Sequence, residues 1–291
     1  MCRMKMQWIV PVLCLAIVTA CKKKEEPTPP PAAAETKTIE TTSSAATTTQ
    51  QQVTVTLAAG APIPANGVAL WLIADDAKAD GSGKLASWSN SAVAGVTASA
   101  DKPELQPRVV AKAINGHAVV RFDGDQNMLV TNIDISPARM PDATVFAVFN
   151  SKSDLATPLR KLYGDDNGGY DRAAGLDDRA GEGMNYTVFT GNGVHGYFTL
   201  KADQAYVTTD QFTKTDFSGW VNGAAGPQKI AAAWEDALPN LYIGGTGDSY
   251  HEPWQGDLAE MIVYARVLTD RERMQVEDYL AKKYGVQIAR K

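Results

Sequence analysis

Two short segments of this 291-residue chain gather side chains that could bind a ligand. Residues 165–171 read Asp-Asp-Asn-Gly-Gly-Tyr-Asp, so that carboxylate and amide oxygens stand beside glycines that permit a tight turn. Calcium is bound by several such oxygens delivered from a short loop. The segment therefore predicts a calcium site that uses Asp165, Asn167 and Asp171. A plain turn between strands remains the alternative interpretation.

The second segment is aromatic. Tyr250, His251 and Trp254 stand within five residues of one another, and glycines flank the stretch on both sides. Sugar rings stack on exposed aromatic side chains while nearby polar groups bind their hydroxyls. We therefore predict a ligand-binding loop at 250–254, with Trp220, close to an Asn-Gly turn, as a second candidate.

The chain offers little for catalysis. Its three histidines fall in different segments, no pair of them has zinc-binding spacing, and no Gly-x-Ser-x-Gly elbow occurs. We predict no catalytic residue and no certain cofactor, with calcium as the one candidate. The net charge of −5 and the absence of a basic stripe argue against a nucleic-acid partner.

The first 20 residues have the pattern of a cleavable secretory signal. Two basic residues precede an apolar run at 9–18, and small residues follow it. The sequence Val18-Thr19-Ala20-Cys21 resembles the lipobox of bacterial lipoproteins. This resemblance implies cleavage before Cys21, a diacylglycerol thioether on its sulfur, and a fatty-acyl chain such as palmitate on the new N-terminus. An ordinary secretory signal that happens to end beside a cysteine is the alternative.

The rest of the chain divides by composition. Residues 21–65 comprise the lipidated cysteine and a tether rich in Pro and Thr, too poor in apolar side chains to fold. Residues 66–291 are long enough for one domain with its own core. Cys21 is the only cysteine outside the signal, so this domain has no disulfide. We expect a protein anchored by lipid in the cell envelope, at the outer membrane, on its periplasmic or surface face.

The elements that must position these side chains are mostly strands. Runs rich in Val, Tyr, Phe and Trp alternate with turn pairs such as Asn115-Gly116 and Asn222-Gly223, without interleaved helices. This pattern predicts an all-β fold of two packed antiparallel sheets. The expected strands are 68–74, 117–122, 144–149, 185–189, 194–200, 241–243 and 258–264. Trp71 and Trp88 are expected in the core.

One helix is expected at the C-terminal end. Thr269 and Glu272 form a capping box, Val276 and Leu280 stand one helical turn apart, and Gly285 supplies the stop.

Several motifs together resemble the bacterial laminin-G-like, or concanavalin A-like, lectin/glucanase domains over residues 68–286. They are Leu70-Trp71-Leu72 with Trp88, the stretch 120–124, and Gly-Asp-Leu-Ala-Glu-Met-Ile-Val-Tyr at 256–264 followed by the helix. The resemblance implies a jelly-roll sandwich. It also implies calcium at one rim of the sandwich and a role among lectins, adhesive modules or glycan-cleaving enzymes, between which the fold does not choose.

The enzymes of this group carry recognisable patterns that this chain lacks. Glucanases place their carboxylates as Glu-x-Asp-x-Glu on one strand face, and alginate lyases use Arg-x-Glu with Gln-x-His; neither is present. Asp257 and Glu260 are spaced by three, which predicts opposite faces of a strand. We therefore expect a non-catalytic module that recognises a glycan or a protein at the envelope. A carbohydrate-active enzyme, hydrolase or lyase, and a structural envelope protein are the alternatives.

Overall fold

The computed structural model describes residues 61–152, 159–180, 185–226, 229–235, 237–248 and 250–290. The chain divides into two units, Met1–Gln50 and Gln51–Lys291, and every described residue belongs to the second. The predicted signal peptide, Cys21 and most of the predicted tether lie outside the described residues. Among the residues that are described, no helix is long and apolar enough to cross a membrane.

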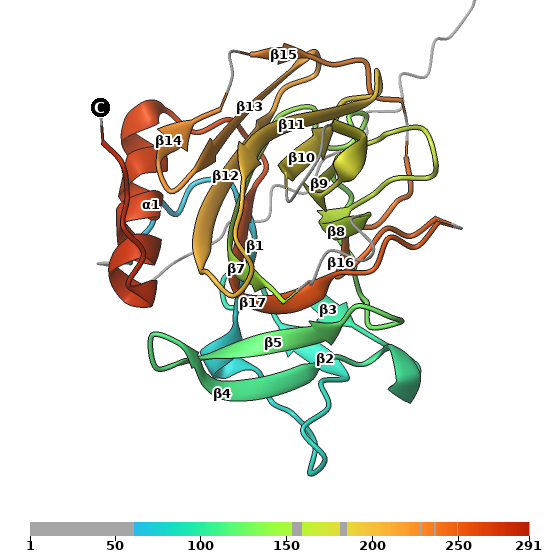
Figure 1. Cartoon of the computed structure of the whole chain (residues 1–291), viewed down its shortest axis with the longest axis vertical. Coiled ribbons are helices and arrows are strands. Elements are labelled where there is room, and N and C mark those ends of the chain that lie inside the picture. The colour runs from blue at the N-terminus through green and yellow to red at the C-terminus, as the bar shows by residue number, and fades with distance from the viewer. Residues whose placement is uncertain are drawn as a thin grey trace, which may run out of the picture. The chain divides into compact units, whose positions relative to one another are not determined.

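The described residues form two antiparallel sheets (Figure 1). The first, which we call the helix-side sheet, has the order β14-β13-β12-β7-β17-β5-β4, with β1 paired to β17 and β15 paired to β13. Its strands are β1 (Val68–Ile73), β4 (Arg108–Ile114), β5 (His117–Asp123), β7 (Ala143–Ser151), β12 (Tyr206–Phe212), β13 (Asp216–Val221), β14 (Ala224–Ala225), β15 (Ile230–Ala231) and β17 (Gln255–Tyr264).

The second sheet, which we call the loop-side sheet, has the order β11-β10-β9-β8-β16-β6-β3-β2. Its strands are β2 (Ser87–Ser89), β3 (Thr97–Ser99), β6 (Leu129–Thr131), β8 (Arg160–Gly164), β9 (Ala173–Leu176), β10 (Asn185–Phe189), β11 (Val194–Thr199) and β16 (Tyr242–Ile243). Three short 3-10 turns complete the described fold: η1 (Ala74–Asp76), η2 (Pro103–Leu105) and η3 (Asp178–Ala180).

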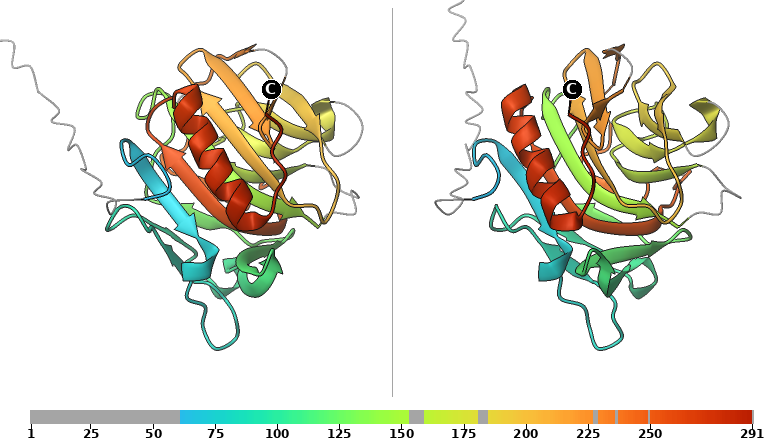
Figure 2. Two further views of the ribbon diagram at one scale, coloured as in Figure 1. Left: turned by 90° about the vertical axis from the view of Figure 1, so that its left-hand side faces the viewer. Right: turned by 60° about the vertical axis from the view of Figure 1, so that its left-hand side comes forward.

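The predicted helix is α1 (Asp270–Tyr284), which lies across the outer face of the helix-side sheet and contacts β12 and β7 (Figure 2). Thr269 and Glu272 form the predicted capping box, and Gly285 ends the helix in the left-handed conformation at φ 67°. The predicted all-β sandwich with two antiparallel sheets and one C-terminal helix is therefore confirmed.

The core has two layers. Between the sheets, residues such as Leu72, Trp88 and Phe149 are buried in one large apolar cluster, and a second cluster joins the helix-side sheet to α1 through Trp71 and Leu280. Alternate residues of the central strands face the two layers, as the two-residue period of a strand requires. Burying one such side chain contributes roughly 1.5–3 kcal/mol. The expectation that Trp71 and Trp88 are core residues is confirmed.

One detail of β17 corrects the sequence analysis. A register shift occurs between Leu258 and Glu260, where the pairing of β17 with β7 skips Ala259. An extra residue in a strand reverses the alternation beyond it. Asp257 pairs with Asn150 and Glu260 with Val148, so both carboxylates belong to the same outer face of the sheet. The prediction that Asp257 and Glu260 lie on opposite faces is wrong, because the spacing of two residues in the sequence does not reveal a bulge between them.

Candidate functional site

Three loops meet on the outer face of the loop-side sheet. They are residues 165–172 between β8 and β9, residues 177–180 after β9, and residues 244–248 and 250–254 between β16 and β17. A Cβ atom on Gly168 would lie only 3.8 Å from Cε2 of Tyr250. The acidic segment and the aromatic segment, which the sequence analysis treats as separate sites, therefore lie side by side.

Two tyrosines stand exposed at this junction. Tyr250 is 73% exposed and Tyr170 is 36% exposed. The ring of Tyr170 packs edge-on against Phe189 with 5.2 Å between centroids, and the guanidinium of Arg179 lies 5.6 Å from the Tyr170 centroid. Arg179 and Phe189 thus support Tyr170 from the protein side and leave part of its ring to solvent.

A charged network lies beneath these rings. Nζ of Lys161, which is fully buried, lies 2.7 Å from Oδ2 of Asp177 and 3.3 Å from Oε2 of Glu252. Arg179 donates from Nη2 to Asp177 at 2.5 Å and to Glu252 at 2.7 Å. Burial alone would raise the pKa of Asp177, but hydrogen bonds from Arg179 and Lys161 outweigh it and leave that pKa below its ordinary value. Two cations and two carboxylates balance, which is the condition for burying such charges.

The backbone at the site is strained. Tyr170, His251 and Glu252 have φ angles of 61°, 62° and 29°, in the left-handed region that bulky side chains rarely adopt. Hydrogen bonds maintain these conformations: the amide of Gly191 donates to the Tyr170 carbonyl at 2.7 Å, and the amide of Glu252 donates to the Tyr250 carbonyl at 2.7 Å. Strain of this kind clusters at binding and catalytic sites.

The acidic loop holds carboxyl groups in an unusual environment. Asp165 is fully buried, and neither of its carboxyl oxygens accepts a hydrogen bond from a described residue. Burial raises the pKa of Asp165 well above its ordinary value. Asp166 accepts a hydrogen bond from the amide of Asp171 at 2.8 Å, and burial raises its pKa to about 6, with a further contribution from the charge of Asp248.

The predicted calcium ligands are only partly assembled. A Cβ atom on Gly169 would lie 3.4 Å from Oδ2 of Asp171 and 3.5 Å from Oδ1 of Asn167, so these two oxygens lie near the same glycine. Within the described ranges, no group of three or more His, Cys, Asp or Glu side chains could hold a metal ion. The carboxyl oxygens of Asp165, which accept no hydrogen bond from a described residue, could bind a cation. Too few carboxylates converge on one point to form a complete calcium site, so calcium stays a prediction.

The predicted tryptophans lie elsewhere. Trp254 is fully buried and packs edge-on against Phe149 at 5.3 Å, so the expectation that it could stack on a ligand is wrong. It precedes β17 and turns into the core, where its large apolar ring gains more than at the surface. Trp220 is half-buried on β13 of the other sheet, 4.2 Å beneath the guanidinium of Arg273. It does not join Tyr250 and His251.

Several important members of the site are absent from the predictions made from the sequence. Tyr170 lies inside the acidic segment, where an aromatic residue among turn formers could have marked it. Lys161, Asp177 and Arg179 belong to no predicted motif. Glu252 lies inside the predicted loop 250–254 but is not among its predicted ligand contacts. The association of these four residues depends on how distant strands pair.

Comparisons with known proteins give structural neighbours only. No protein-family model matches the chain, and no curated protein matches it. The sialidase of Trypanosoma rangeli in complex with 2,3-difluorosialic acid is similar at a TM-score of 0.53 and 14% identity, over 75% of this chain and 33% of the sialidase. A mutant of a protein designated HCR/D is similar at a TM-score of 0.50 and 8% identity, over 74% of this chain and 52% of that one. The receptor binding domain of botulinum neurotoxin C/D mosaic serotype follows at 0.48 and 11%, with the same coverage.

The chain thus spans about a third of the sialidase it matches. The likenesses at TM-scores of 0.50 and above fall below 25% identity, so they support the β-sandwich fold and nothing finer.

Proposed function

We propose that this protein is a non-catalytic recognition module of the cell envelope that binds a glycan between Tyr170 and Tyr250. The observation that carries the proposal is the pairing of two exposed tyrosines, one on a strained backbone, above a buried ion network. Aromatic faces flanked by fixed polar groups are what sugar recognition requires. Because the chain is acidic, at a net charge of −5, a neutral glycan suits it better than a polyanionic one.

Two further parts of the proposal concern the anchor and the metal. Acylation of Cys21 would hold the protein at the outer membrane, since several acyl chains anchor a protein stably. Calcium bound near Asp165, Asn167 and Asp171 would shape the loop beside Tyr170. A membrane partner through the lipid and a glycan or envelope protein through the site are therefore the expected partners.

A carbohydrate-active enzyme is the second candidate, and one observation favours it. A general acid needs a pKa near the working pH, and burial raises the pKa of Asp166 to about 6. Asp177 and Glu252, in contrast, both form ion pairs with Arg179 and Lys161.

A glycan array tests the proposal with the full-length protein extracted from membranes in mild detergent, with calcium and with EDTA. We expect a neutral glycan to bind, and Tyr170→Ala or Tyr250→Ala to weaken it at least about tenfold, roughly 1.4 kcal/mol. Trp220→Ala is the matched control on the other sheet and should bind normally. The intact mass of the same preparation shows whether Cys21 is acylated.

Two results would count against the proposal. The absence of any glycan binding under both conditions, or unchanged binding by both tyrosine variants, would contradict the site. Release of new reducing ends or unsaturated products, abolished by Asp166→Asn, would instead establish the enzyme.

A further inference from the structure

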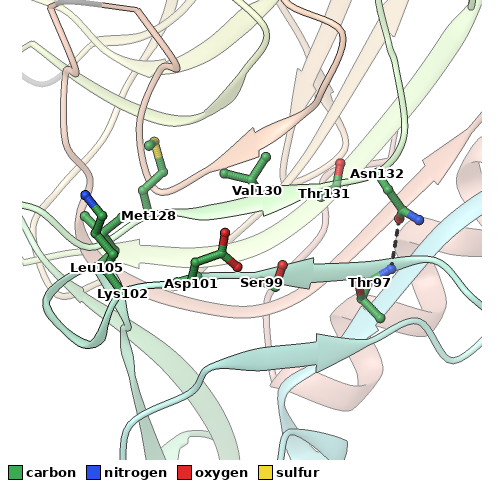
Figure 3. A pocket seen from close by; sticks show the side chains of 10 residues that line it. Thr97, Ser99, Asp101, Lys102, Leu105, Met128, Val130, Thr131 and Asn132 are labelled. Carbon is green, nitrogen blue, oxygen red and sulfur yellow. Dashed lines mark hydrogen bonds between the residues drawn. The ribbon is translucent and has the colours of Figure 1, made fainter.

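A hollow of about 380 Å³ opens on the outer face of the loop-side sheet between β3 and β6 (Figure 3). Apolar side chains of Leu105, Met128 and Val130 line part of it, and Ser99 with Asp101 lines the side opposite β6 (Figure 3). A hollow that combines apolar patches with hydroxyl and carboxylate groups offers both kinds of contact that a sugar ring makes.

The neighbouring turn fixes the shape of one end of this hollow. The amide of Thr97 donates to Oδ1 of Asn132 at 3.1 Å, and Nδ2 of Asn132 donates to the Gly95 carbonyl at 2.9 Å. These bonds connect β3 to the end of β6. The hollow is therefore built by paired strands and a bonded turn, which makes it a preformed site.

The hollow adjoins the loop that carries Tyr250. Val130 is the direct cross-strand neighbour of Tyr242, which in turn pairs with Gly164 at the end of β8. On the same side, a Cβ atom on Gly245 would lie 3.6 Å from the sulfur of Met128 and 3.8 Å from Cε1 of His251. Met128 thus lies between the hollow and the loop that carries Tyr250.

Between the two places, the backbone at Gly247 packs closely against the ring of Tyr242 on β16. A Cβ atom at Gly247 would lie 2.4 Å from the ring of Tyr242, so no side chain fits there without displacing that ring. The path from β3 through β6 and β16 to β8 crosses three strand spacings, or roughly 14 Å at about 4.8 Å each. This length exceeds a single sugar ring.

We infer that the hollow is a second subsite of the same ligand surface, so the protein binds a neutral glycan chain of several sugar units along its length rather than one terminal sugar. This inference rests on the proposed function, because it takes Tyr170 and Tyr250 as the first subsite. Asp101 and Lys102 stand exposed at the hollow, where they can accept from and donate to sugar hydroxyls.

The test measures affinity against chain length for the full-length protein in detergent. The probes are cello-, laminari- and chito-oligosaccharides of one to six units. In the series that binds, we expect affinity to rise about tenfold from the dimer to the hexamer, roughly 1.4 kcal/mol. The double variant Asp101→Ala/Lys102→Ala and the space-filling variant Ser99→Ile should each remove that rise and leave dimer affinity within about twofold.

The controls separate this inference from the proposed function. Lys214→Ala, an exposed lysine in the β12–β13 turn, should preserve the full rise. An affinity that reaches its maximum at the dimer, or a rise that survives both hollow variants, would overturn the second subsite while the tyrosine site stands. If none of the three series binds and the array also shows no bound glycan, the proposed function and the second subsite fall together. If the array shows a different neutral glycan, the same length series of that glycan gives the test.

Discussion

Each face of the sandwich contains a buried glutamate that is bound by cations or by aromatic side chains. The two glutamates differ in the regularity of the backbone around them and in how fully the neighbouring polar groups are hydrogen-bonded. On the helix side, Glu260 accepts hydrogen bonds from Nε1 of Trp71 at 2.6 Å and from Nζ of Lys283 at 2.7 Å. Tyr284 and Tyr279 donate to it at 2.8 and 3.0 Å. Every partner comes from a regular strand or from α1.

On the loop side, Glu252 is bound by Lys161 and Arg179, but it sits on a left-handed backbone beside an exposed tyrosine. Nearby, the buried carboxyl of Asp165 accepts no hydrogen bond from any described residue. A polar network whose members are all satisfied stabilises a fold, whereas unmet acceptors and strain cost stability unless a ligand compensates. The difference favours a stabilising role for the helix-side network, and it fits the proposal that the loop side binds a ligand.

The largest expected effect comes from Glu260→Ala on the helix side. The change leaves Lys283 and the indole and phenol donors without their acceptor, so we expect the free energy of unfolding to fall by about 3–5 kcal/mol. Urea denaturation measures this. Glycan affinity at the tyrosine site should stay unchanged in the folded fraction.

The matched control is Glu235→Ala, which removes an exposed glutamate and should change stability by less than about 0.5 kcal/mol. A loss below about 1 kcal/mol for Glu260→Ala would show that the helix-side network does not carry the stability assigned to it.

A second prediction concerns Asp210, which lies buried between the two sheets. Tyr163 donates to it at 2.7 Å and Tyr186 at 2.9 Å, and Tyr197 donates to its other oxygen. Burial raises the pKa of Asp210 to about 6 despite these bonds. A raised pKa means that the folded state keeps its proton longer than the unfolded chain, so stability is lost as pH rises from about 4 to above 6.

The expected loss over that window is about 3 kcal/mol, since one pKa unit corresponds to about 1.4 kcal/mol. Urea unfolding at pH 4, 5, 6 and 7 measures it. Asp210→Asn should remove only the share of the slope that Asp210 contributes, about 3 kcal/mol. Asp166→Asn, at the site, removes the separate share of Asp166, whose pKa burial also raises to about 6, and should leave the Asp210 contribution intact. Parallel pH curves for wild type and Asp210→Asn would contradict the assignment.

The fold could be predicted for those elements whose structure is determined by residues adjacent in the sequence. The apolar runs that became β1, β7 and β17 and the caps of α1 carry their structure in a few adjacent residues. The strands β8 and β12 escaped prediction because they contain Lys161 and Asp210, which look like surface residues. Both are buried because partners from other segments bind them: Asp177 binds Lys161, and three tyrosines bind Asp210. A pattern within one segment cannot show such partners.

The site was predictable only in pieces. The turn-rich acidic segment and Tyr250 are visible as sequence, but the pairing of β8 with β16 that joins them is not. The prediction for Trp254 failed for a related reason. A shift of one residue moves a side chain from solvent to core, and nothing adjacent to Trp254 fixes that register.

The smallest expected effect separates the backbone strain at His251 from its contribution to ligand binding. Glycine adopts positive φ without penalty, so His251→Gly should raise the free energy of unfolding by about 1 kcal/mol. The control is Lys112→Gly in β4 on the helix-side sheet, where φ is 55°, and we expect a similar gain. Thermal unfolding with a urea series measures both.

Only the loop-side change should alter recognition. His251→Gly removes a polar ring beside Met128 and loosens the backbone that presents Tyr250, so glycan affinity should fall severalfold, whereas Lys112→Gly should bind as the wild type does. If both variants gain stability and neither loses affinity, the left-handed backbone at His251 is a feature of folding alone. The contrast between the two faces would then rest on Asp165 and the exposed tyrosines.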